Sequence, residues 1–182
     1  MIVNLPNGLT ALRIILIPFF VGFSSLPGED GYIMSAVFFS LAAWTDWADG
    51  YVARRQGLFT SFGRFFDPVA DKLLVISALV LLVSDGRAPL ALVMILLARE
   101  VTVMALRERL AGLSLPVPVS KSAKVKTAFQ MTAIIMLLLQ DGIGGVNFQL
   151  PGLIFLFIST LFSLFSGYRY LIDAWPHLQQ GK

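Results

Sequence analysis

Six long apolar stretches recur along this chain, and they constrain its fold more than any other feature. They fall near residues 9–27, 31–53, 67–84, 88–110, 122–140 and 150–172. Each is long enough to cross a bilayer as a helix that begins or ends with polar residues at the interface. They are continuous in Leu, Ile, Val and Phe, without the alternation typical of a membrane β-strand. The sequence therefore predicts an all-α integral membrane protein, a six-transmembrane-helix bundle that forms a single domain over residues 1–182.

The composition agrees with a membrane protein and excludes several other classes. Hydrophobic residues make up 57% of the chain and charged residues 14%, which is too apolar for an ordinary soluble domain. The net charge of +3 is explained by the topology of a membrane protein, and no soluble basic domain is available. We therefore expect no nucleic-acid partner. The absence of Cys excludes a disulfide scaffold and thiol chemistry.

The basic residues predict the orientation of the helices. The links near residues 27–30, 85–88 and 141–149 contain only Arg87 of the 14 Lys and Arg residues. All the others lie in the remaining links or at the helix ends on the same side. Because basic residues concentrate on the cytoplasmic side of a membrane protein, we expect both termini to be cytoplasmic.

A cluster of aspartates lies at the predicted cytoplasmic ends of the second and third helices. The chain reads Asp46-x2-Asp49-Gly50-x2-Ala53-Arg54-x8-Gly63-x3-Asp67-x3-Asp71. The spacing places the first aspartates on one helical face and the last two on another. Several carboxylates at a bilayer edge repel one another and lose hydration, so they need to be neutralised.

Bound metal is the simplest way to neutralise these carboxylates. All-oxygen ligation favours a hard divalent ion such as Mg²⁺ or Mn²⁺, whereas zinc would more often recruit Cys or His. Two neighbouring ions are a recurrent device for displacement at phosphorus. The sequence therefore predicts an active site with two metal ions at a membrane, held by Asp46, Asp49, Asp67 and Asp71.

This aspartate pattern resembles the signature of the CDP-alcohol phosphatidyltransferase family at every required position. The resemblance implies a six-helix membrane bundle, often a homodimer, that transfers a phosphatidyl group from a CDP-linked lipid to an alcohol. It also implies that Asp71 is both a metal ligand and the general base that accepts the proton of the acceptor hydroxyl.

The resemblance also implies a site for the CDP-lipid. Gly50 and Gly63 would let nucleotide groups approach the backbone, Ala53 avoids bulk and Arg54 can pair with a phosphate. Close helix packing is the alternative explanation of the glycines. The opening Asn4-Leu-Pro-Asn7-x-Leu-Thr10-x2-Arg13 resembles the bacterial phosphatidylglycerophosphate synthases, one branch of this family. The expected CDP-lipid contacts are Asn7, Thr10, Asp49, Gly50, Ala53, Arg54 and Gly63.

The second half of the chain resembles the same branch and suggests the acceptor. Arg99 and Arg107 share a helix face, so with lysines of the next segment they can receive the phosphate of glycerol 3-phosphate. One departure is Ala123, which stands where the family more often has Gly. These cations could instead only follow the topology bias or contact anionic lipids. The expected acceptor phosphate-binding residues are Arg99, Arg107, Ser120, Lys124 and Lys126.

The sequence thus predicts an enzyme of a bacterial cytoplasmic membrane with its active site on the cytoplasmic side. Its expected partners are CDP-diacylglycerol, glycerol 3-phosphate, membrane lipids and a second copy of the chain, and its products are phosphatidylglycerophosphate and CMP. One alternative is transfer to another acceptor, namely an inositol phosphate, serine or phosphatidylglycerol. The other is a cation transporter, which is disfavoured because the aspartates lie at helix ends and not near the bilayer midplane.

Overall fold

The fold is all-α, as the sequence predicts. The computed structural model describes residues 5–26, 28–56, 61–112, 121–139 and 143–179, and over these ranges it contains helices and no strand. The helices are α1 (Leu5–Ser24), α2 (Glu29–Gln56), α3 (Ser61–Ser84), α4 (Leu90–Gly112), α5 (Lys121–Leu139), the short 3-10 helix η1 (Ile143–Gly145) and α6 (Gln149–Gln179). Each α-helix overlaps most of one apolar stretch, although their bounds differ by a few residues.

Not every helix is a simple apolar span. In the described part of the chain, Ser122–Leu139 and Gln149–Pro176 are long and apolar enough to cross a membrane, and Gly8–Ser24 is a shorter apolar helical stretch. Charged residues interrupt the others, including Asp71 and Lys72 in α3 and Glu100 in α4. The membrane-embedded character therefore has support from the helices, whereas the count of six spans stays a prediction.

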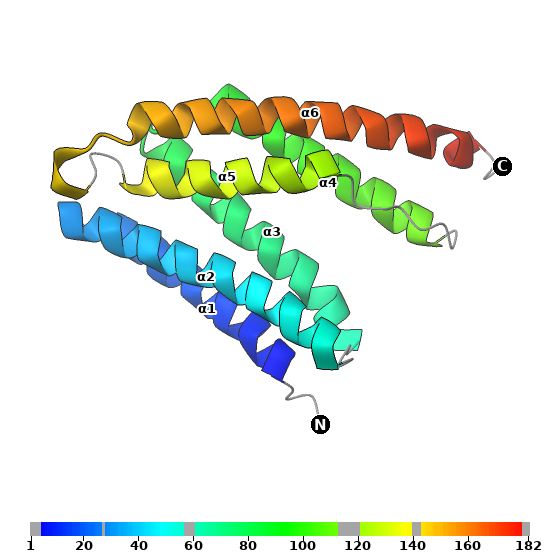
Figure 1. Cartoon of the computed structure of the whole chain (residues 1–182), viewed down its shortest axis with the longest axis horizontal. Coiled ribbons are helices and arrows are strands. Elements are labelled where there is room, and N and C mark those ends of the chain that lie inside the picture. The colour runs from blue at the N-terminus through cyan, green and yellow to red at the C-terminus, as the bar shows by residue number, and fades with distance from the viewer. Residues whose placement is uncertain (1–4, 27, 57–60, 113–120, 140–142, 180–182) are drawn as a thin grey trace.

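The helices include two closely packed pairs, and α3 contacts members of both (Figure 1). The α4 helix packs chiefly on α6, and α2 contacts α5 directly. The α1 helix packs chiefly on α2, and α5 packs on α6, while α3 contacts α1, α2, α4 and α5. The ends joined by the α1–α2, α3–α4 and α5–α6 connections lie toward the left of the view. The start of α1 and the end of α6 both lie toward the right, on the same side of the bundle.

Arg87, the basic residue that departs from the charge pattern, has a structural role. Its side chain is 7% exposed, and its Nη1 donates to the carbonyl oxygens of Leu138 at 3.1 Å and Leu137 at 3.4 Å. These carbonyls belong to the last turn of α5, where helical partners are missing. The guanidinium also lies 4.4 Å from the ring centroid of Tyr32, and its Nη2 is 3.4 Å from Asp85 Oδ2. Arg87 thus links α2, the α3–α4 turn and α5.

A glycine allows the close packing of α5 on α6. A Cβ at Gly152 would lie 2.8 Å from Cγ of Leu137, which is fully buried. Helices in membranes associate through such close contacts between small residues and their neighbours, because lipid tails remove most of the hydrophobic drive. The close α5–α6 contact therefore depends on glycine, which has no side chain, at position 152.

We predict that Gly152→Ala lowers the free energy of unfolding by about 1–3 kcal/mol, because Leu137 must shift within a packed interface. Thermal unfolding of the purified protein in detergent measures the change. The matched control is Gly22→Ala in α1, where an added Cβ meets nothing within 4 Å. This control should keep or raise the stability, since Ala is the better helix former. Equal midpoints for the two variants would contradict the packing argument.

Candidate active site

The predicted metal-binding aspartates lie on two helices that touch. Asp46 and Asp49 belong to the C-terminal half of α2, Asp67 and Asp71 belong to the N-terminal half of α3, and α2 contacts α3. The side chains of residues 46–56 and 61–65 lie outside the described part of the structure. The predictions for Asp46, Asp49, Gly50, Ala53, Arg54 and Gly63 therefore rest on the placement of their helices.

Asp67 faces α1. Its Oδ1 accepts a hydrogen bond from the Thr10 hydroxyl at 2.5 Å, and Thr10 is 1% exposed. Arg13, one turn further along α1, is fully buried. Thr10, which sequence analysis assigned to the CDP-lipid, thus contacts Asp67, whereas the Asn7 side chain lies outside the described residues.

The donor chemistry of this region fits a hard divalent cation. Asp67 and Asp71 are one helical turn apart on α3 and offer carboxylate oxygens, which Mg²⁺ and Mn²⁺ prefer. Among the side chains that the structure describes, no three His, Cys, Asp or Glu residues are grouped to hold a metal ion. The other two expected ligands, Asp46 and Asp49, are not among those side chains.

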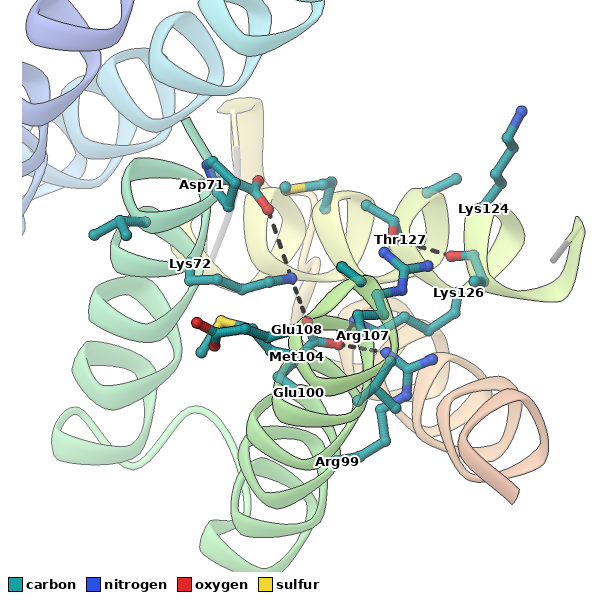
Figure 2. A pocket seen from close by; sticks show the side chains of 17 residues that line it. Asp71, Lys72, Arg99, Glu100, Met104, Arg107, Glu108, Lys124, Lys126 and Thr127 are labelled. Carbon is teal, nitrogen blue, oxygen red and sulfur yellow. Dashed lines mark hydrogen bonds and ion pairs between the residues drawn. The ribbon is translucent and has the colours of Figure 1, made fainter. Parts of the chain in front are cut away.

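A cavity of about 1050 Å³ opens beside Asp71, between α3, α4 and α5 (Figure 2). Apolar residues such as Val103 and Met131 form part of its wall. Its charged lining consists of five cations and three carboxylates, namely Asp71, Lys72, Arg99, Glu100, Arg107, Glu108, Lys124 and Lys126. The excess of cations suits an anionic ligand.

Glu100 is the centre of an ion-pair network in this cavity. Its Oε2 accepts a hydrogen bond from Lys72, and its Oε1 accepts hydrogen bonds from Lys126 and, at 2.9 Å, from Arg99. The side chain of Glu100 is 8% exposed and that of Lys126 is 4% exposed. Figure 2 shows these groups converging between α3, α4 and α5. A carboxylate at this depth is stable because cations surround it.

Arg99 is fixed from the opposite side by α6. Its Nε donates to the carbonyl oxygen of Ser163 at 3.2 Å, and its Nη2 donates to the Ser166 hydroxyl at 2.7 Å. The α6 backbone passes close to the arginine, since a Cβ at Gly167 would lie 3.1 Å from Arg99 Cγ. Arg99 therefore joins α4 to α6 while one of its N–H groups points to Glu100.

The remaining predicted acceptor residues have different surroundings. Arg107 Nη2 donates to the Tyr170 hydroxyl at 2.7 Å, with the guanidinium 5.1 Å from the centroid of that ring. Lys124 lines the cavity but is exposed, and Figure 2 shows its side chain directed away from Glu100. Ser120 lies outside the described residues. The structure thus brings Arg99, Arg107, Lys124 and Lys126 to the same cavity.

Sequence analysis missed Lys72 and gave no role to Glu100. The Lys72 ammonium lies between two carboxylates, 3.6 Å from Asp71 Oδ2 and hydrogen-bonded to Glu100. The sequence did contain a signal for Lys72, which is a charged residue in an otherwise apolar stretch, directly after the last aspartate of the motif. Charged residues within membrane helices are generally functional. Asp71 consequently stands at the border between the aspartate region and the cationic cavity.

Comparison with known proteins identifies the family of this chain. A sequence profile described as CDP-alcohol phosphatidyltransferase matches residues 3–165. Proteins named CDP-diacylglycerol--glycerol-3-phosphate 3-phosphatidyltransferase are similar over nearly their whole length. The protein of Pseudomonas fluorescens is 44% identical over 181 residues, covering 97% of this chain and 92% of its own. The protein of Bacillus subtilis strain 168 is 38% identical over 194 residues, covering 97% of each chain. That of Rickettsia typhi is 40% identical over 168 residues, covering 92% of this chain and 94% of its own. This chain therefore belongs to the CDP-alcohol phosphatidyltransferase family.

Proposed function

We propose that this protein transfers the phosphatidyl group of CDP-diacylglycerol to glycerol 3-phosphate, forming phosphatidylglycerophosphate and CMP. The similarity to relatives named for this reaction extends over almost the entire chain. The structural observation that carries the proposal is the cationic cavity, of about 1050 Å³, beside Asp71. Such a cavity provides a place for a phosphorylated, water-soluble acceptor next to the general base.

The proposed setting is a bacterial cytoplasmic membrane that the chain crosses six times. Support comes from the alternating helices, which leave the start of α1 and the end of α6 on one side of the bundle. The aspartate motif and most basic residues belong to that side, and the positive-inside bias makes it cytoplasmic. CDP-diacylglycerol would keep its acyl chains in the bilayer while its diphosphate reaches the aspartates.

Asp46, Asp49, Asp67 and Asp71 are the residues that would hold two Mg²⁺ or Mn²⁺ ions in this enzyme. When bound, such ions supply positive charge that stabilises the diphosphate and the departing CMP. The protein's own contribution is to fix the ligands. The hydrogen bond from Thr10 orients one oxygen of Asp67, as outer partners of metal ligands generally do.

Asp71 is positioned to act as the base. It accepts the proton of the glycerol hydroxyl as that oxygen forms a bond to the β-phosphorus of CDP-diacylglycerol. The bond between the β-phosphorus and the bridging oxygen breaks, and CMP leaves with that oxygen. Cations of the cavity bind the acceptor phosphate, so that the hydroxyl is held against Asp71 and the reaction becomes effectively intramolecular.

The first prediction from the proposed function concerns the acceptor. Purified protein with CDP-diacylglycerol and Mg²⁺ or Mn²⁺ should release CMP when glycerol 3-phosphate is added, and the lipid product should be phosphatidylglycerophosphate. Serine, an inositol phosphate and phosphatidylglycerol are the comparison acceptors. Labelled CMP release with mass spectrometry of the lipids measures the outcome. Turnover with another acceptor and none with glycerol 3-phosphate would refute the assignment, and divalent-cation flux into liposomes without CMP would favour the transporter.

The second prediction concerns Asp71. Asp71→Asn should lower kcat by about a thousandfold, because the acceptor proton loses its base. Binding of CDP-diacylglycerol should largely persist, since most of its site remains. Steady-state CMP release and calorimetric titration with the lipid in detergent separate the two effects. Asp173→Asn, an exposed carboxylate change in α6, is the control and should keep wild-type turnover. Normal turnover of the Asp71 variant would remove its role as base.

The third prediction concerns the Thr10 hydroxyl. Thr10→Val should raise the Kd for Mn²⁺ by about tenfold, because Asp67 loses the partner that orients it. Thr10→Ser keeps the hydroxyl and should bind the ion nearly as well as the wild type. Titration of Mn²⁺ into the protein, followed by electron paramagnetic resonance without lipid substrate, gives the Kd independently of turnover. Identical Kd values for the Val and Ser variants would show that this hydrogen bond does not support metal binding.

A further inference from the structure

Glu100 is the carboxylate of the cavity that sits deepest. Its side chain is 8% exposed, compared with 29% for Asp71, and Glu108 is exposed. The reaction proposed above gives Glu100 no chemical step. A buried carboxylate on the wall of an anion-binding cavity repels a phosphate, so the presence of Glu100 calls for a favourable role that offsets this repulsion. The contacts of Glu100 indicate that role.

The three cations that donate to Glu100 come from three different helices. Lys72 belongs to α3, Arg99 to α4 and Lys126 to α5. Arg99 is itself held by α6 through Ser163 and Ser166. Glu100 therefore fixes the relative positions of two flexible lysine side chains against an arginine that is anchored elsewhere.

The lysines keep donors for a ligand. An ammonium group has three N–H groups, so Lys72 and Lys126 each use one on Glu100 and have others to direct at oxygens in the cavity. The five cations and three carboxylates that line the cavity leave two excess positive charges. A phosphate monoester carries about −1.5 to −2 at neutral pH, which matches this excess.

Lys72 also connects this cluster to the base. Its ammonium lies 3.6 Å from Asp71 Oδ2 while it donates to Glu100. An acceptor whose phosphate binds the lysines would thus be held at a set distance from Asp71. Placement of this kind favours reactive geometries and does not require Glu100 to touch the substrate.

We propose that Glu100 is a positioning residue for the acceptor: it holds Lys72 and Lys126 so that their remaining N–H groups bind the acceptor phosphate beside Asp71. This inference rests on the proposed function and adds the residues that place the phosphorylated acceptor. It also separates the roles of the cations, since Arg99 anchors Glu100 while the lysines contact the phosphate.

The test is the effect of Glu100→Gln on the KM of each substrate. The KM for glycerol 3-phosphate should rise about tenfold or more, while the KM for CDP-diacylglycerol stays within about twofold. If Glu100 contributed only negative charge, its removal would lower the acceptor KM, so the sign of the change decides. Glu108→Gln removes the same charge from the cavity wall without breaking an ion pair that the structure describes, and should lower that KM slightly. A lower or unchanged acceptor KM in Glu100→Gln overturns the proposal, as does an equal rise for both substrates.

Lys72→Gln provides a second test, and measured alone it does not depend on the folding of the Glu100 variant. Lys72 is 32% exposed in its side chain, so this change is milder. It should raise the acceptor KM by about threefold or more. When Lys72→Gln and Glu100→Gln are combined, the change in binding free energy should be smaller than the sum of the changes in the two single variants. An unchanged acceptor KM, or full additivity, contradicts positioning through Glu100.

Binding of inorganic phosphate separates a failure of this inference from a failure of the proposed function. Phosphate should raise the Tm of the wild type in detergent, and it should do so much less for Glu100→Gln. A wild-type enzyme that releases no CMP with glycerol 3-phosphate, yet shows this difference, would refute the reaction while supporting the phosphate site. Equal stabilisation of both proteins by phosphate would refute the site itself.

Discussion

An ionisable side chain inside an apolar helix bundle is stable only where another group neutralises it or satisfies its hydrogen bonds. This constraint accounts for the placement of two buried charged groups, Glu100 and Arg87. Glu100 lies among three cations, and Arg87 lies against the carbonyl oxygens at the end of α5. The contacts of Glu100 with Lys72 and Lys126 join α4 to α3 and α5, and Arg87 joins the α3–α4 turn to α5. The polar groups of the bundle therefore also fix how the helices are arranged.

The α3 helix is central because it takes part in both polar regions. Asp67 faces α1 through Thr10, whereas Lys72, little more than one turn later, reaches Glu100 on α4. Asp71 lies between them along the helix. A single rigid element thus sets the distance between the region proposed for the CDP-lipid and the cavity proposed for the acceptor. This arrangement suits a reaction in which one substrate stays in the bilayer and the other arrives from water.

Hydropathy was sufficient to predict the helices, because each one contains a continuous apolar stretch of membrane-like length. It did not settle the number of spans, since charged residues such as Asp71 and Glu100 interrupt α3 and α4. The charge pattern predicted that both termini are cytoplasmic, and this orientation stays a prediction, while the start of α1 and the end of α6 lie on one side of the bundle. The pattern could not explain Arg87, whose partners are backbone carbonyls that leave no trace in the sequence.

The candidate site was predictable to the extent that it follows from spacing along one helix. The aspartates of α3 share a face by periodicity, and Arg99 and Arg107 were expected at one cavity for the same reason. The contacts of Lys72, Glu100 and Lys126 arise from three helices that are distant in the sequence. The periodicity of one helix does not determine which of its charged residues contacts a residue of another helix. These ion pairs could be identified only from the three-dimensional structure.

The network also indicates why arginine and lysine are not equivalent here. A guanidinium has five N–H groups in a fixed plane, and Arg99 directs three of them to Glu100, Ser163 and Ser166. A planar group that is held by α6 at two points is suited to fixing the position of the Glu100 carboxylate. An ammonium at the end of a flexible chain can turn its remaining N–H groups toward a ligand as that ligand binds. This difference assigns the rigid part of the acceptor site to Arg99 and the adaptable part to Lys72 and Lys126.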